Sequence, residues 1–318
     1  IGTSVAGGMG IVMFGGIKPS PGATEPAKGL RVGMIGLDTS HSIAFTKLLN
    51  DPKAGADLGG YRVVAAYPYG SRDIESSAKR IPGYIEDIKK LDVSITESIA
   101  ELLEKVDVVL LETNDGRLHL EQALQVFKAG KRVFIDKPLA ASLADAIAIS
   151  DAAKEYNVPF FSASSLRFME SIQKLAKDNT VGKVLGAATY SPCSIEKTHP
   201  DLVWYGIHGV EMLFAIMGTG CKSVTRVHTE QTDFVTGTWE NDRIGTFRGM
   251  RAGKNDYGGT VFGEKAIVNL GSYGGYRPLL VEIVKFFQTG QAPVRPDETV
   301  EMFAFMEAAD ESRKQGGA

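Results

Sequence analysis

A lysine and a histidine stand where the chain could bring them into one active site. Lys137 follows the apolar run VFI, which predicts a buried strand. His208 lies in DLVWYGIHGVEMLF, where a helix would place Trp204, His208 and Glu211 on one face. A lysine at a strand end can hydrogen-bond a substrate hydroxyl, and an imidazole beside a carboxylate is a common general acid or base. A solvated lysine and a packed histidine are the alternatives, which these residues alone leave open.

Short apolar runs alternate with helical stretches between residues 30 and 162. The pattern predicts strands at 30–35, 61–67, 106–112, 132–135 and 158–162, and helices at 42–49, 72–80, 99–105, 118–129 and 143–156. Such alternation indicates an α/β fold with a parallel, doubly wound sheet. Ligands bind these sheets at the carboxyl ends of the strands, so the loops that follow the strands are the candidate binding loops.

The first of these loops reads GLDTSH, where a dinucleotide-binding turn would read G-x-G-x-x-G. Gly36 allows a tight turn, and a helix that begins near Ser40 would present free N–H groups to a phosphate. Asp38 stands where a glycine normally lets the phosphates approach. Alternatively, Asp38 and Ser40 only cap the helix. The candidate cofactor residues of this turn are Gly36, Asp38, Thr39, Ser40 and His41.

The later loops add further candidate cofactor residues. Arg72 follows the second strand, where an arginine accommodates the 2′-phosphate of NADP, so the cofactor is NAD or NADP with a slight preference for NADP. Asp73 is the alternative, either as a ribose-binding acid or as a helix cap. The candidates on these loops are Ser71, Arg72, Thr113, Asn114 and His119.

The pattern changes after residue 166. Alternating segments such as SVTRVHTE, DFVTGTWE and GGTVFG predict a mostly antiparallel sheet, closed by helices at 276–288 and 298–314. We therefore expect a Rossmann domain at 29–165 and an α+β domain with an open sheet at 166–318, whose last helices can pack back on the first domain.

Composition restricts the partners and the location. A net charge of −3 gives no basic field for nucleic acid or an anionic membrane. Two cysteines and five histidines lack the spacing of a metal site, so we expect no metal. Residues 1–28, a small apolar run and a polar linker, predict the remnant of a twin-arginine-type export signal and a periplasmic protein. A flexible tail on a cytoplasmic protein is the alternative.

Several segments together resemble one family, the Gfo/Idh/MocA oxidoreductases. The most specific is VDVVLLETNDGRLHLEQALQVFKAGKRVFIDKPLAASLADAIAISDAAKE, and SSLRF, VGKVLGA and WYGIHGVEMLFAIMG also match. The resemblance implies a Rossmann domain followed by an open-sheet domain that often mediates homo-oligomers. It makes Lys137 the catalytic lysine and His208 the base that takes the substrate's hydroxyl proton. Gly36 then belongs to the phosphate loop, Asp136 to the family's E-K-P motif, and Glu211 to the position one turn beyond the histidine.

The chain departs from the family at informative positions. Trp204 replaces the aspartate before the histidine, Asp136 replaces a glutamate, and Asp38 and His41 replace glycines. We expect an NAD(P)-dependent oxidoreductase acting on a hydroxyl or keto group of a sugar, cyclitol or glycoside. A non-catalytic carbohydrate-binding or regulatory protein, or a lyase working through transient oxidation, is the alternative. The expected substrate-binding residues are Arg167, Trp204, Tyr205, His208 and Glu211.

Overall fold

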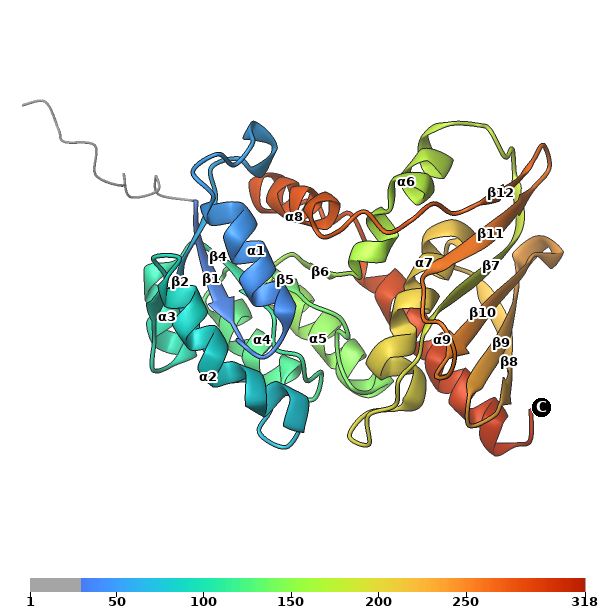
Figure 1. Ribbon diagram of the computed structural model, residues 1–318, viewed down its shortest axis with the longest axis horizontal. Coiled ribbons are helices and arrows are strands. Elements are labelled where there is room, and N and C mark those ends of the chain that lie inside the picture. The colour runs from blue at the N-terminus through green and yellow to red at the C-terminus, as the bar shows by residue number, and fades with distance from the viewer. Residues whose placement is uncertain (1–29, 318) are drawn as a thin grey trace, which may run out of the picture.

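The computed structural model describes residues 30–317, which fold into two domains, each built on one sheet (Figure 1). The expected export segment, residues 1–28, lies outside the described residues and stays a prediction. Within residues 30–317, every helix is too short or too polar to span a membrane.

The first sheet is parallel throughout, with strand order β3-β2-β1-β4-β5-β6, which confirms the predicted Rossmann architecture. Its strands are β1 (Arg31–Ile35), β2 (Arg62–Tyr67), β3 (Ser94–Ile95), β4 (Val108–Leu111), β5 (Val133–Ile135) and β6 (Phe160–Ser162). The intervening helices are α1 (Ser40–Asn50), α2 (Glu75–Lys89), α3 (Ile99–Lys105), α4 (His119–Lys128) and α5 (Leu143–Glu155). Hydroxyl side chains cap the N-termini of three of these helices: Thr39, Ser98 and Ser142 accept the backbone N–H groups of His41, Glu101 and Asp145.

The second sheet is mixed, with order β12-β11-β7-β10-β9-β8. Only β7 and β10 run parallel among its described pairs, so the predicted mostly antiparallel sheet is confirmed. Its strands are β7 (Val184–Pro192), β8 (Cys221–His228), β9 (Thr232–Trp239), β10 (Ile244–Met250), β11 (Gly258–Gly263) and β12 (Ile267–Asn269). The helices are α6 (Glu170–Lys177), a π-helical turn (Leu202–Gly206), α7 (Ile207–Met217), α8 (Arg277–Thr289) and α9 (Pro296–Lys314). Short 3₁₀ turns lie at Ala56–Leu58, Ser165–Phe168 and Glu240–Asp242.

Helices from the end of the chain bind the two domains together (Figure 1). Helix α8 returns to the first domain, where Phe286 packs edge-on against Phe161 of β6 at 5.1 Å between ring centroids. Helix α9 lies between α5 and the second sheet and contributes Met302, Phe303 and Phe305 to a core shared by both domains. Continuous apolar packing of this kind fixes the orientation of the two sheets.

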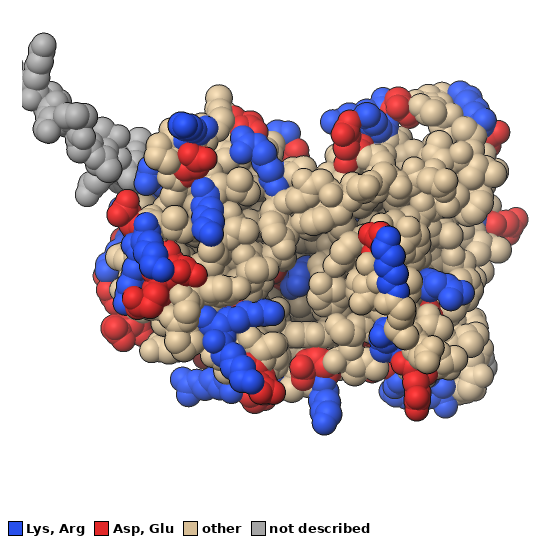
Figure 2. Space-filling view, in the orientation of Figure 1, with Lys and Arg blue, Asp and Glu red and all other residues tan. Residues whose placement is uncertain are grey.

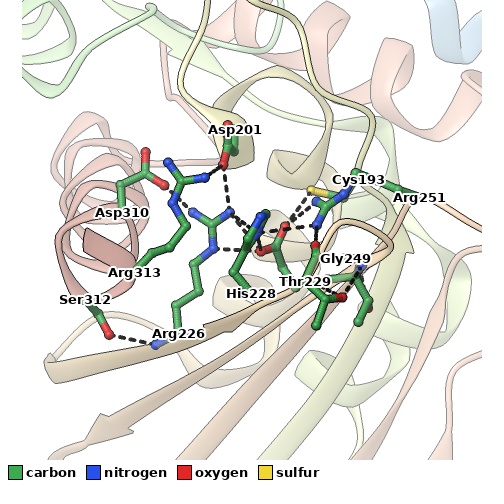
Figure 3. A network of polar contacts seen from close by, with 12 residues as sticks. Cys193, Asp201, Arg226, His228, Thr229, Gly249, Arg251, Asp310, Ser312 and Arg313 are labelled. Carbon is green, nitrogen blue, oxygen red and sulfur yellow. Dashed lines mark hydrogen bonds and ion pairs between the residues drawn. The ribbon is translucent and has the colours of Figure 1, made fainter. Parts of the chain in front are cut away.

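A buried ion network ties α9 to the segment that leads into the π-turn (Figure 3). Arg226 of β8 is fully buried and pairs with Asp233 at 2.8 Å, with Asp201 at 2.9 Å and with Asp310 of α9. Arg251 pairs with the second oxygen of Asp233. Since Asp201 directly precedes the π-turn, the network anchors the start of the helix that carries His208.

Candidate active site

A cavity of about 320 Å³ opens between the two domains, and Figure 2 shows the hollow from one face. From the first domain it is lined by Thr39, Ser40, His41, Ser76, Arg80, Asn114 and Lys137. From the second it is lined by Ser165, Leu166, Ser194, Trp204, Tyr205, His208, Tyr257, Tyr273 and Tyr276. It thus lies at the carboxyl ends of β1, β4 and β5, where a parallel sheet binds ligands.

The turn after β1 is unusually tight. Gly36 has φ +89°, and a Cβ on it would lie 2.5 Å from the backbone nitrogen of Thr113, so only glycine fits. Asp38 follows and is fully buried. Its carboxylate accepts the backbone N–H groups of Ser71 and Asn114, each at 3.0 Å. Burial raises the pKa of Asp38, and these two hydrogen bonds oppose that rise. Asp38 therefore ties three loops together and does not reach the cavity.

The residue that caps helix α1 is neither Asp38 nor Ser40, the two expected caps, but Thr39 between them. Thr39 is its N-cap, and the Thr39 hydroxyl accepts the His41 N–H at 3.3 Å. Asp38 is not the cap because its carboxylate is held by the other loops, and Ser40 is already helical. Thr39 and Ser40 line the cavity, so the positive end of the α1 dipole faces it.

Lys137 and His208 come from different domains and line the same cavity. Lys137 is only 7% exposed, and among the described residues its ammonium has no hydrogen bond or ion pair. Burial, followed by the neighbouring charges of Lys137 and His41, lowers the pKa of His208 well below its usual 6.5. His208 is therefore neutral at pH 7 and can accept a proton.

Ser164, rather than Glu211, holds the imidazole of His208. The Ser164 hydroxyl lies 2.7 Å from His208 Nδ1. Glu211 is buried in an ion pair with Arg167, which also pairs with Glu298 at 2.6 Å. The π-helical turn changes the angular spacing between Trp204 and His208, whereas His208 and Glu211 both lie on the regular helix α7. Glu211 does not hold the imidazole because Arg167 engages its carboxylate. Arg167 and Glu211 form a structural pair outside the cavity lining.

Aromatic rings form much of the second domain's wall. Trp204 lies on the π-turn and contacts the His199 ring at 4.9 Å between centroids. The Tyr205 and Tyr257 hydroxyls lie 3.1 Å apart, and both rings stand edge-on to His208. A wall of this kind suits a ligand with an apolar face and hydroxyl edges.

Of the remaining residues expected to bind the cofactor, some line the cavity and others lie outside its lining. Thr113 and Asn114 follow β4, and Asn114 lines the cavity. Ser71 is buried, and its hydroxyl donates within the loops to carboxylates such as Asp115 at 2.8 Å. His119 is buried, with its ring nitrogens 2.7 and 3.1 Å from the carbonyl oxygens of Thr113 and Leu139. Arg72 is exposed and lies outside the cavity lining.

The sequence did not single out several cavity residues. Arg80 and Ser76 lie on α2, and Tyr257, Tyr273 and Tyr276 come from loops flanking β11, β12 and α8. For Arg80 the sequence offers only a weak indication of a cavity position, namely a cationic side chain in the helix that follows β2. The tyrosines lie in glycine-rich segments whose path is set only by packing between domains, so no local pattern predicts them.

Comparison with known proteins decides the family of the first domain. Residues 30–164 match the GFO_IDH_MocA model, described as an oxidoreductase family with an NAD-binding Rossmann fold. This domain belongs to the Gfo/Idh/MocA oxidoreductases. Among curated proteins, an uncharacterized oxidoreductase of Streptococcus pneumoniae is 27% identical over 154 residues, 43% of this chain and 41% of the relative. The 2,7-anhydro-N-acetylneuraminate hydratase of Escherichia coli is 33% identical over 87 residues, 26% of this chain and 23% of the hydratase. The chain thus matches less than half the length of these two curated relatives.

Solved structures extend the similarity of fold to both domains. A probable dehydrogenase from Thermotoga maritima superposes with a TM-score of 0.73 at 21% identity, covering 90% of this chain and 97% of that one. The scyllo-inositol dehydrogenase from Lactobacillus casei, solved with NAD(H) and scyllo-inositol, gives 0.73 at 14% identity, covering 91% and 98%. These likenesses show that the chain shares the two-domain fold of these proteins.

Proposed function

We propose that the protein is an NAD(P)-dependent oxidoreductase that acts on a hydroxyl or keto group of a sugar, cyclitol or glycoside. The observation that carries the proposal is the convergence of Lys137 and His208 on one cavity from two domains. The matched family supplies the cofactor class, and the fold places the cavity at the carboxyl edge of the Rossmann sheet.

The residues at this edge fit the nicotinamide end of a dinucleotide. Lys137 offers an unpaired, buried ammonium for ribose or substrate oxygens, and Thr39 and Ser40 stand at the positive end of α1. Arg80 adds a cation on α2 that can face a phosphate. Asp38 alters the turn, because its carboxylate takes the N–H groups of two neighbouring loops. When bound, a nicotinamide would serve as the hydride acceptor or donor.

The chain's own groups then handle the proton. With the proton on Nδ1, the His208 ring donates to Ser164 and leaves Nε2 free to take the proton of a substrate hydroxyl. Lys137 can donate a hydrogen bond to the same substrate oxygen and fix its position. The tyrosines over the cavity, with Trp204, reduce access of water to that oxygen.

The lining favours an uncharged or anionic ligand. None of the described residues that line the cavity carries a carboxylate, whereas Arg80 and Lys137 are cationic. Carbohydrates and cyclitols combine hydroxyl edges with apolar C–H faces, which match the tyrosine hydroxyls and the ring of Trp204. The neighbours named as inositol dehydrogenases support this substrate class by analogy of fold.

Calorimetric titration with NAD, NADH, NADP and NADPH tests the cofactor assignment. We expect saturable binding of at least one of the four, weakened by Arg80→Ala because that guanidinium lines the cavity. If the preference for NADP is correct, Arg72→Ala weakens NADP more than NAD. Absence of binding by all four nucleotides at millimolar concentration would remove the oxidoreductase proposal and favour carbohydrate binding without turnover.

We also propose that the protein forms a homo-oligomer through the open face of its second sheet. Helices α7 and α9 cover one face, and the strand register places exposed apolar side chains on the other. These are Tyr190, Val227, Phe234, Ile244, Phe262 and Ile267. An exposed sheet face with this many apolar side chains is consistent with an association surface. Light scattering should give a mass above the 34.2 kDa chain, and Ile244→Lys should reduce it; a monomeric wild type would contradict this proposal.

A further inference from the structure

One imidazole and two carboxylates form a buried cluster behind the cavity wall. His41 lies in the first turn of α1, Glu112 directly follows β4, and Asp136 directly follows β5 beside Lys137. One ligand atom from each of the three side chains lies within 4.8 Å of the other two. Glu112 and Asp136 are fully buried, and His41 is 7% exposed. Three elements therefore direct ionisable groups at one point inside the first domain.

Most of the lone pairs of these side chains lack a hydrogen bond, although His41 and Asp136 form an ion pair. Both oxygens of Glu112 and both of Asp136 have no hydrogen bond among the described residues. His41 Nδ1 lies 2.8 Å from Asp136 Oδ2 and 3.8 Å from Glu112 Oε2, yet it is not aligned with either as a hydrogen bond. Burying a carboxylate costs free energy unless the carboxylate is paired with a cation, hydrogen-bonded or bound to a metal. Orphaned groups in this number point to a bound species.

We propose that His41, Glu112 and Asp136 bind one divalent first-row transition-metal ion. Metal–nitrogen and metal–oxygen bonds of about 2.0–2.2 Å place neighbouring ligand atoms about 3.0 Å apart in an octahedral site and about 3.4 Å apart in a tetrahedral one. The distances of 2.8 and 3.8 Å bracket those values. An imidazole with two carboxylates suits zinc, manganese, iron or cobalt, whereas calcium and magnesium prefer oxygen ligands alone.

A proton shared among the three groups is the competing occupant. It could neutralise one carboxylate, but it would leave most of the remaining lone pairs unpartnered. A divalent ion takes a lone pair from His41 Nδ1 and from each carboxylate, and its charge offsets those of the two acids, which the nearby Lys137 ammonium offsets only in part. A bound ion would therefore explain why all three side chains are buried with lone pairs that lack hydrogen bonds.

The site has an open coordination position. Structural zinc sites usually have four protein ligands, whereas three protein ligands leave a place for water or substrate. His41 also lines the cavity, so the proposed site borders the cavity wall. The proposal goes beyond the oxidoreductase function and does not depend on it, since the metal can bind whether or not a nucleotide does. It also replaces the sequence-based expectation of no metal.

The test is metal analysis of the full chain. Purified wild-type protein, stripped with a chelator and reloaded with zinc, manganese or cobalt, is passed over a sizing column and measured by elemental mass spectrometry. We expect about one equivalent of at least one metal to remain bound and to raise the melting temperature. With cobalt, visible absorption bands should report nitrogen and oxygen ligands. Less than about a tenth of an equivalent of each metal, with no thermal shift, would overturn the proposal.

Isosteric variants locate the ion. Glu112→Gln and Asp136→Asn keep the side-chain volume but remove a ligand charge, so each should lose most of the bound metal. Asp38→Asn is the matched control, because Asp38 is an equally buried carboxylate nearby that lies outside the cluster. It should retain the full equivalent. Metal retained at wild-type stoichiometry by Glu112→Gln would show binding elsewhere and would also overturn the proposal, whatever the activity or nucleotide affinity.

Discussion

The Ser164 hydroxyl lies 2.7 Å from Nδ1 of His208, where the end of the Rossmann sheet meets the second domain. Ser164 follows β6, and His208 stands on α7, so the contact couples the base to the domain junction. Both side chains are buried. A single hydroxyl therefore sets the orientation of the imidazole toward the cavity, a role that the sequence had given to Glu211.

Replacing Ser164 should disturb turnover more than binding. Ser164→Ala removes one hydrogen bond to the imidazole, so we expect kcat to fall about three- to tenfold with KM nearly unchanged. Ser164→Thr retains the hydroxyl and should restore most of the rate. Steady-state kinetics, with melting temperatures to monitor folding, measure the effect. An unchanged kcat in Ser164→Ala would separate the serine from catalysis.

The pH profile of oxidation should reflect a neutral base. Burial, with Lys137 and His41 nearby, lowers the pKa of His208 well below 6.5, so the basic form is already complete at neutral pH. We expect kcat/KM to be constant from about pH 8 down to 6.5 and to fall only in more acidic buffer. His208→Gln should lack this acidic limb. A limb centred above pH 6.5 that disappears in His208→Gln would contradict the assignment of the pKa.

Asp38 should contribute to stability as a tie between loops. Asp38→Ala leaves the buried N–H groups of Ser71 and Asn114 without their acceptor. We expect the free energy of unfolding to fall by about 1–3 kcal/mol, measured by urea denaturation. Asp87→Ala, at a half-exposed position on α2, is the control and should change it by less than about 0.5 kcal/mol. Equal effects in the two variants would argue against the tie.

The free energy of unfolding should also depend strongly on the Arg226 ion network. Arg226→Met leaves Asp233 and its neighbours buried without their central cation, which should cost about 3–5 kcal/mol in unfolding free energy. Arg313→Met removes a partly exposed cation from the same cluster and should cost less than about 1 kcal/mol. Chemical denaturation compares them. A loss below about 1 kcal/mol for Arg226→Met would show that the network is not structurally required.

The sequence predicts the fold well where hydrophobic periodicity is strong. The long strands of the first domain and most of its helices were expected within a few residues, because buried runs such as VVLL carry a clear pattern. Helix α2 is the exception: it was predicted at 72–80 but continues to Lys89, through Pro82 and Gly83, which normally favour a helix end. Strand β3 (Ser94–Ile95) was not predicted, since two residues are too few to show a period. The convergence of Lys137 and His208 on one cavity agrees with the sequence-based expectation for these two residues.

Contacts between distant segments could not be predicted in the same way. The π-turn before His208 is a local irregularity that no helical period reveals, and the ion pair of Glu211 with Arg167 forms only when distant segments pack together. Asp38 looked like a phosphate-loop residue until the structure placed its carboxylate against two other loops. His41, Glu112 and Asp136 meet only after the sheet assembles, so their spacing along the chain shows no metal motif.

Reduction of NAD and NADP by the full chain, followed by absorbance of the reduced nicotinamide, tests the account most directly. The reaction is surveyed with neutral sugars, cyclitols and glycosides. We predict turnover with at least one member, a loss of about 10²–10⁴-fold in both Lys137→Ala and His208→Ala, and a normal rate in the exposed control Lys154→Ala. Near wild-type turnover in both cavity variants, or no reduction of either nucleotide with any member, would contradict the account.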